Sequence, residues 1–215
     1  MRFRTVVFDC DSTLTAIEGI DELARNNRAE IAHLTSLAMS GVLPLEEVYG
    51  RRLAIIRPTE AEVTAVGRKY VEQIAPGAER AVQGLLQAGV VVQILSGGLA
   101  PAVRILARHL GVAPERVAAV DLRFGPGGEY AGFDADSLLA RSGGKRRWLE
   151  ELGGSLPRPV LLVGDGATDL EARPAVDAFA VFTGIVAREE IVSRADHVIP
   201  GPSLVNLLPL CGLRA

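Results

Sequence analysis

The sequence predicts an α/β protein with an open parallel Rossmann-like sheet and an inserted helical cap domain. Two observations carry this prediction. Four short apolar runs recur along the 215 residues with helical patterns between them, the alternation typical of a parallel sheet. Residues 15–75 interrupt the alternation with helical periodicity alone. The length suffices for one core domain that carries a smaller insertion.

Each of the four apolar runs is predicted to be a buried strand. The runs are short, rich in β-branched or aromatic residues, and end in small or polar residues. The first run ends at Asp9, the second at Ser96, and the third just before Asp165. We expect the strands at residues 5–8, 90–95, 160–163 and 178–182.

The segment 15–75 is predicted to be the cap. Its apolar residues follow helical spacing, and Thr59 with Glu62 has the spacing of a capping box at a helix start. Residues 1–14 and 76–215 are then the catalytic core, and 15–75 the helical cap domain. Within the core, a glycine-rich turn between residues 121 and 134 predicts a hairpin.

Composition excludes several classes of partner. Hydrophobic residues make up 48% of the chain, charged residues 23%, and the formal net charge is −3. No basic stripe exists to bind nucleic acid, and no apolar run is long enough to span a membrane. The first residues lack the pattern of a signal peptide, and two cysteines do not make a disulfide framework. We therefore expect a cytoplasmic protein with reduced thiols.

Polar residues that follow the predicted strands should converge. Ligands of open parallel sheets bind outside the carboxyl ends of the strands, so these residues share one edge of the sheet. A lysine opens a predicted helix on the same side. The residues at this edge are Asp9, Asp11, Thr13, Ser96, Gly97, Asp165 and Asp169, together with Lys145.

This edge carries an excess of negative charge. At an effective dielectric constant near 20, two unit charges about 4 Å apart repel by roughly 4 kcal/mol. One lysine cannot balance four carboxylates, and Mg²⁺ prefers carboxylate, water and phosphate oxygens as ligands. The sequence therefore predicts Mg²⁺ as cofactor, with Asp9, Asp11, Asp165 and Asp169 as the metal site.

The same residues can divide the work of phosphoryl transfer. Asp9, at a strand end, is predicted to be the nucleophile that forms an aspartyl phosphate. Asp11 could protonate the leaving alkoxide and later take a proton from water. Ser96 and the Gly97 backbone N–H could bind phosphate oxygens, and Lys145 could neutralise their charge.

Each of these features also occurs alone for structural reasons. An Asp-x-Asp sequence after a strand is often a turn with local caps, and a lysine at a helix start is often only solvated. A Ser-Gly-Gly sequence is often only a strand-to-helix turn. Their occurrence together, in this order and each after the right kind of segment, indicates an active site.

These motifs resemble those of the haloacid dehalogenase-like phosphatases. The segment from Asp9 to Thr13 resembles the first motif of that family, Ser96 the second, Lys145 the third, and the segment from Gly164 to Asp169 the fourth. The resemblance implies a haloacid dehalogenase-like core, with Asp9 as nucleophile and Asp11 as general acid and base. It also implies Mg²⁺ held by Asp9, the Asp11 backbone carbonyl and Asp165, with Asp169 close by.

Further stretches resemble the phosphoserine phosphatase branch of that family. They are residues 18–24, 52–56, 128–134 and 164–172, spread over nearly the whole chain. The resemblance implies O-phospho-L-serine as substrate, the last step of serine biosynthesis, and is compatible with a homodimer. It implies that Glu18 contacts the substrate ammonium and Arg52 its carboxylate. The implied substrate-binding residues are Glu18, Met39, Arg52, Ser96, Gly97, Gly98, Lys145 and Thr168.

Charge and geometry agree with the roles of Glu18 and Arg52. Phosphoserine carries an ammonium and a carboxylate besides its phosphate, and the planar fork of arginine can bind both carboxylate oxygens. Without the resemblance, Glu18 would be interpreted as an acid at a helix start, and Arg52 as a solvated helical residue.

Other functions remain open at this point. The same scaffold could hydrolyse another small phosphate ester, or transfer the phosphoryl group to an alcohol such as homoserine. A phosphoryl-accepting switch without turnover is a second class, against which Asp11 argues because a stable switch needs no general acid. A purely structural domain would leave the charge at the strand ends unexplained.

Overall fold

The computed structural model describes residues 3–24, 27–39, 43–151 and 153–214, and the side chains of 35–39, 45 and 153 lie outside this description. A six-stranded parallel sheet forms its centre, in the order β3-β2-β1-β6-β7-β8. The strands are β1 (Thr5–Phe8), β2 (Val91–Leu99), β3 (Val117–Val120), β6 (Val160–Gly164), β7 (Ala178–Phe182) and β8 (His197–Ile199). The α/β class with a parallel sheet is confirmed.

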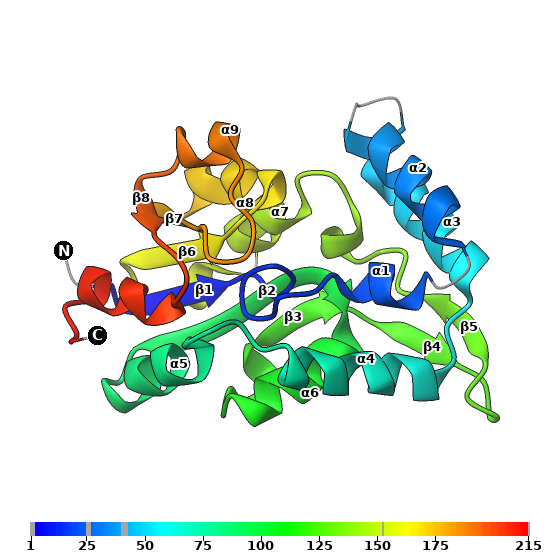
Figure 1. Cartoon of the computed structure of the whole chain (residues 1–215), viewed down its shortest axis with the longest axis horizontal. Helices are drawn as coiled ribbons and strands as arrows, with labels where there is room; N and C mark the ends of the chain where they lie inside the picture. The colour runs from blue at the N-terminus through cyan, green and yellow to red at the C-terminus, as the bar shows by residue number, and fades with distance from the viewer. Residues whose placement is uncertain (1–2, 25–26, 40–42, 152, 215) are drawn as a thin grey trace.

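Helices cover both faces of the sheet (Figure 1). On one face lie α5 (Ala78–Gln87) and α6 (Ala100–His109), and on the other α7 (Gly144–Glu151) and α8 (Ala167–Ala172). A short helix, α9 (Glu189–Val192), follows β7. Five 3₁₀ helices lie within the described ranges: Pro114–Arg116, Leu138–Ala140, Gly153–Ser155, Arg173–Ala175 and Leu204–Cys211.

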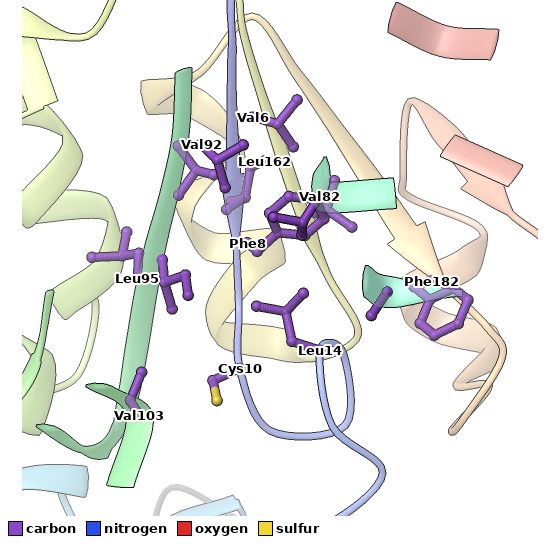
Figure 2. Packing of buried hydrophobic residues seen from close by; sticks show 14 of the residues in the cluster. Val6, Phe8, Cys10, Leu14, Val82, Val92, Leu95, Val103, Leu162 and Phe182 are labelled. Carbon is purple, nitrogen blue, oxygen red and sulfur yellow. The ribbon is translucent and has the colours of Figure 1, made fainter. Parts of the chain in front are cut away.

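The core is centred on β1 and β6, whose residues are all buried. Phe8 pairs with Val163 of β6 on one side and with Ile94 of β2 on the other. Figure 2 shows Phe8 next to Leu162 and to Val82 of α5, which closes the core from one face. The Asp9 backbone N–H donates to the Val163 carbonyl at 2.9 Å, so the neighbouring strand β6 fixes the residue that follows β1.

The described part of the segment 15–75 contains four helices and, at its two ends, an isolated antiparallel bridge between Thr15 and Ile74. It contains α1 (Gly19–Leu23), α2 (Arg28–Met39), α3 (Leu45–Ile56) and α4 (Glu60–Glu72). The predicted capping box is confirmed: Thr59 accepts from the Glu62 backbone N–H, and Glu62 from that of Thr59. In Figure 1, α2 and α3 stand at one end of the molecule, whereas α4 lies along α6.

The sheet differs from the prediction in its two edge strands and in the length of its second strand. The edge strands β3 and β8 were not predicted, because their sequences, Val-Ala-Ala-Val and His-Val-Ile, are short and only weakly apolar. The second strand continues past the predicted end at residue 95 to Leu99, which pairs with Val120 beyond an irregularity in register. The predicted hairpin is confirmed as β4 (Leu122–Phe124) and β5 (Tyr130–Phe133).

Within the described residues, no helix combines the length and the apolar character needed to cross a bilayer. The division into a core of 1–14 with 76–215 and a cap of 15–75 stays a prediction. Contacts between α4 and α6 show that the last helix of the predicted cap packs closely on the core: a Cβ at Gly67 would lie 2.5 Å from Ile105.

Candidate active site

Three aspartates meet at the carboxyl edge of the central strands. Asp9 follows β1, Asp165 follows β6, and Asp169 lies in the first turn of α8. Because β1 and β6 are paired, their carboxyl ends are adjacent. One carboxylate oxygen from each aspartate lies within 4.8 Å of the others, and all three residues are buried. Three carboxyl groups are thus gathered away from bulk water.

Lys145 balances part of this charge. It lies at the start of α7, is 6% exposed, and its Nζ is 2.7 Å from Oδ1 of both Asp9 and Asp169. Burial opposes the charged form, but the carboxylates of Asp169 and Asp9 outweigh it and raise the pKa of Lys145. The lysine therefore stays charged and holds two carboxylates in place.

The two oxygens of Asp9 have different surroundings. Oδ1 accepts from the Cys10 backbone N–H at 2.8 Å and from Lys145. Both of the contacts that the structure records for this carboxylate thus fall on one oxygen, which leaves Oδ2 to act as a nucleophile. Burial raises the pKa of Asp9 well above its ordinary value, and the charge of Lys145 opposes this shift.

Asp11 lies two residues on and is set up for proton transfer. Its Oδ1 accepts from the Tyr70 hydroxyl at 2.6 Å and from the Gly19 backbone N–H at 3.0 Å. Burial and then the charge of Glu18 raise the pKa of Asp11 to about 7, against the hydrogen bond from Tyr70. A carboxyl group with this pKa can both donate and accept a proton near neutral pH.

The Ser96-Gly97-Gly98 sequence lies beside Asp11. Ser96 is buried, and its Oγ accepts from the Gly98 backbone N–H at 2.9 Å, so its own proton is available to a ligand. A Cβ at Gly98 would lie 2.9 Å from Asp11 Oδ2 and 3.0 Å from Ser96 Oγ. Glycine at position 98 thus lets the backbone approach the second oxygen of Asp11. Gly97, between Ser96 and Gly98 in the chain, is half-buried.

Asp165 has two side-chain partners: Thr13, which was expected at this edge of the sheet, and Arg188, which was not. Thr13 Oγ1 donates to its Oδ1 at 3.3 Å, and Arg188 forms an ion pair with its Oδ2. Burial and the charge of Asp169 raise the pKa of Asp165 to about 6, and Arg188 opposes the shift. Arg188 follows the end of β7 by six residues. This position, near the carboxyl edge of the sheet, was the one sequence feature that could have suggested Arg188 as a site residue.

Tyr70 was also missed as a site residue. In the sequence it matches the apolar spacing of a helix, together with Val63 and Val66, and the structure buries it in α4. No local signal distinguishes it from a core tyrosine, because its partner Asp11 is 59 positions away. Gly19 is required at its own position, since a Cβ there would lie 2.0 Å from the Tyr70 hydroxyl oxygen.

Of the predicted cap residues, Glu18 and Arg52 lie near the aspartates. Glu18 accepts from Ser12 Oγ at 2.6 Å, and its charge raises the pKa of both Asp11 and Asp165. Burial lowers the pKa of Arg52 on α3, and among the charges that oppose this are those of Glu18 and Asp11. Glu18 and Arg52 therefore both interact electrostatically with Asp11.

The structure gives less information about two further predicted residues, Thr168 and Met39. Thr168 is exposed in the first turn of α8, directly before Asp169. Met39 ends α2, but its side chain lies outside the described residues. Its predicted place in the substrate pocket therefore stays a prediction.

The aspartate cluster fits a divalent cation. Its donors are carboxylate oxygens, the ligands that hard cations prefer, and their mutual spacing allows all three to contact one ion. Asp9, Asp165 and Asp169 make up this side-chain group, whereas the resemblance assigns Asp11 to the site through its backbone carbonyl. Lys145 and Arg188 balance only part of the charge, so a cation would stabilise the arrangement.

Comparisons with known proteins agree with this geometry. The model of the haloacid dehalogenase-like hydrolase family matches residues 6–172. Mouse phosphoserine phosphatase is 37% identical over 197 residues, which cover 90% of this chain and 88% of the mouse protein. The Arabidopsis thaliana protein named chloroplastic phosphoserine phosphatase is 37% identical over 209 residues, covering 94% and 71% of the two chains.

Solved structures give the same result. A phosphoserine phosphohydrolase-like protein from Francisella tularensis has a TM-score of 0.82 at 25% identity, with 98% of this chain and 99% of that chain covered. A structure described as a phospho-aspartyl intermediate analogue of phosphoserine phosphatase has a TM-score of 0.80 at 25% identity, with both chains fully covered. The chain belongs to the haloacid dehalogenase-like hydrolase family.

Proposed function

We propose that this protein is a Mg²⁺-dependent phosphatase that hydrolyses O-phospho-L-serine to L-serine and phosphate through an aspartyl phosphate on Asp9. The observation that carries the proposal is the position of Asp9: buried, fixed through Oδ1, and next to an Asp11 whose pKa is about 7. The relatives named phosphoserine phosphatase support the choice of substrate.

In the first half of the reaction, Asp9 Oδ2 attacks phosphorus. The bond from phosphorus to the serine Oγ breaks, and protonated Asp11 donates its proton to the leaving oxygen. Lys145 holds Asp9 Oδ1 so that Oδ2 keeps its direction during the attack. Ser96 Oγ and nearby backbone N–H groups bind the phosphoryl oxygens.

In the second half, water attacks the phosphorus of the aspartyl phosphate. Asp11, now a carboxylate, takes a proton from this water, and the bond from Asp9 to phosphorus breaks to release phosphate. Tyr70 and the Gly19 N–H hold Asp11 Oδ1, so proton transfer falls to Oδ2 on the side of Gly98. One carboxyl group thus serves as acid and then as base.

Asp9, Asp165 and the Asp11 backbone carbonyl would hold the cation, with Asp169 beside them. When bound, Mg²⁺ neutralises charge on the transferred phosphoryl group. Lys145 pairs with Asp9 and Asp169 independently of the cation, and Arg188 pairs with Asp165. These two side chains keep the carboxylates close together before a cation arrives.

Recognition of the amino acid is assigned to the predicted cap. Glu18 would bind the ammonium group, and Arg52 the carboxylate, while Met39 and Thr168 would contribute to the pocket. The segment 15–75 would close over the substrate and exclude water during transfer. With this substrate the reaction would complete serine biosynthesis. A cytoplasmic location and a homodimer stay predictions.

A panel of phosphate esters tests the proposed function. With Mg²⁺, phosphate release from O-phospho-L-serine is expected to be at least about ten-fold faster than from other small esters, measured as kcat/KM. EDTA is expected to abolish release, and added Mg²⁺ to restore it. If another ester is preferred, or serine is released without free phosphate because an added alcohol is phosphorylated, the assigned reaction is wrong.

Arg52→Ala is expected to raise KM for phosphoserine about ten-fold or more, because the substrate carboxylate loses a charged partner. An aryl phosphate without a carboxylate should be hydrolysed with little change. Arg51→Ala is the matched control, since Arg51 is exposed and pairs with Glu47. Equal effects of Arg52→Ala on both substrates would remove Arg52 from the amino-acid pocket.

A further inference from the structure

Tyr49 on α3 is a buried tyrosine whose hydroxyl has no use in the fold. Its side chain belongs to the core and is only 3% exposed. Within the part of the chain that the structure describes, the hydroxyl oxygen is buried and has no hydrogen-bond partner. Phenylalanine would fill the same space without the unfavourable burial of a polar group. The hydroxyl therefore points to a ligand that supplies its partner.

The ring of Tyr49 is held from two sides. Its centroid lies 5.3 Å from that of Phe133 on β5, and the guanidinium carbon of Arg52 lies 5.8 Å from the same centroid. Phe133 belongs to the hairpin of the core, whereas Tyr49 and Arg52 are one helical turn apart on α3. These contacts fix the direction of the ring, so the hydroxyl is preorganised rather than mobile.

The contact between the Tyr49 ring and the guanidinium of Arg52 puts both side chains on one face of α3. Burial raises the pKa of Tyr49, and the negative charge of Asp11 adds to this shift, against the charge of Arg52. The hydroxyl therefore stays protonated and can donate. A protonated hydroxyl next to a guanidinium suits an anionic acceptor.

The three charged groups of the substrate leave one acceptor for this hydroxyl. The phosphate belongs with Asp9 and Ser96, and the ammonium with Glu18. The carboxylate, assigned to Arg52, has lone pairs for more than one donor. Tyr49 and Arg52 share a helix face next to the same site, so one carboxylate can meet both.

We propose that the Tyr49 hydroxyl donates a hydrogen bond to the carboxylate of the amino-acid phosphate, beside Arg52, and that Tyr49 is a specificity-determining residue. This inference rests on the proposed function, because it takes the substrate to carry a carboxylate. The neutral donor completes a site in which Arg52 supplies the charge.

Tyr49→Phe, assayed with Mg²⁺, tests the inference on two substrates. O-Phospho-L-serine and O-phosphoethanolamine share the phosphate and the ammonium, but only the first has a carboxylate. Loss of a hydrogen bond to a charged group is expected to lower kcat/KM for phosphoserine about ten- to 100-fold. For phosphoethanolamine, kcat/KM should stay within about two-fold. Tyr130→Phe is the control, since Tyr130 is half-buried on the nearby β5.

Thermal unfolding of Tyr49→Phe without substrate gives a second readout. Its Tm should equal or exceed that of the wild type, because no hydrogen bond within the protein is lost. A lower Tm, or equal losses on both substrates, would show a structural role and overturn the inference. No loss on phosphoserine would overturn it too.

The wild type separates this inference from the proposed function. Suppose that the wild type strongly prefers phosphoserine to phosphoethanolamine and that Tyr49→Phe has the same kcat/KM values. This outcome refutes only the role of Tyr49. A wild type without that preference refutes the assigned substrate, and with it the carboxylate as the partner of Tyr49.

Discussion

Asp9→Asn is expected to lower kcat for phosphate release at least about 100-fold, which corresponds to roughly 2.7 kcal/mol of transition-state stabilisation. The amide keeps the shape of the side chain but is not a nucleophile, so no aspartyl phosphate can form. Lys145 keeps its ion pair with Asp169 when position 9 loses its charge, so the protein should remain folded. Steady-state kinetics and circular dichroism measure the two effects.

Asp136→Asn is the matched control, because the side chain of Asp136 is fully exposed. It should leave kcat and KM unchanged. Affinity for Mg²⁺, measured by calorimetry, should fall in Asp9→Asn and not in the control. Activity above a hundredth of wild type in Asp9→Asn would count against Asp9 as the nucleophile.

Lys145→Met should impair both activity and stability. Methionine keeps much of the length and volume but removes the charge that Asp9 and Asp169 share at 2.7 Å each. Removing one partner of a buried ion pair typically costs about 3–5 kcal/mol. We expect a loss of this size in the free energy of unfolding in urea without metal, and a smaller one with Mg²⁺. The kcat should fall about 100-fold.

Lys69→Met provides the comparison for the effect on stability. Lys69 pairs with Glu22 at 2.8 Å, but both side chains are partly exposed, and such surface pairs contribute at most about 1 kcal/mol. If Lys145→Met were no more destabilising than Lys69→Met, Lys145 would not be holding the carboxylates together.

The sheet was predictable where burial leaves a strong pattern. The central strands β1 and β6 are buried on both faces, so their sequences are continuous apolar runs. The edge strands β3 and β8 are partly exposed, and their patterns are too short to stand out. The capping box at Thr59 is a local signal and was read correctly, because its partner is three residues away.

The site residues that directly follow strands could be predicted from the sequence. The helical residues that pack around them were harder to predict. Topology alone brings Asp9 and Asp165 together, since β1 and β6 are neighbours. Tyr70 and Tyr49 lie on helices, at positions that also fit core packing. The hydrogen bond from Tyr70 to Asp11 depends on how α4 packs on the core, and no local pattern records this.

Trapping the phosphoenzyme tests the central claim most directly. The protein would be quenched during turnover of phosphoserine with Mg²⁺, reduced with borohydride, and its peptides analysed by mass spectrometry. Borohydride converts an aspartyl phosphate into homoserine, so position 9 marks the phosphorylated residue. We expect homoserine at position 9 in the wild type and none without substrate. Homoserine at another aspartate, or none during active turnover, would contradict an aspartyl phosphate on Asp9.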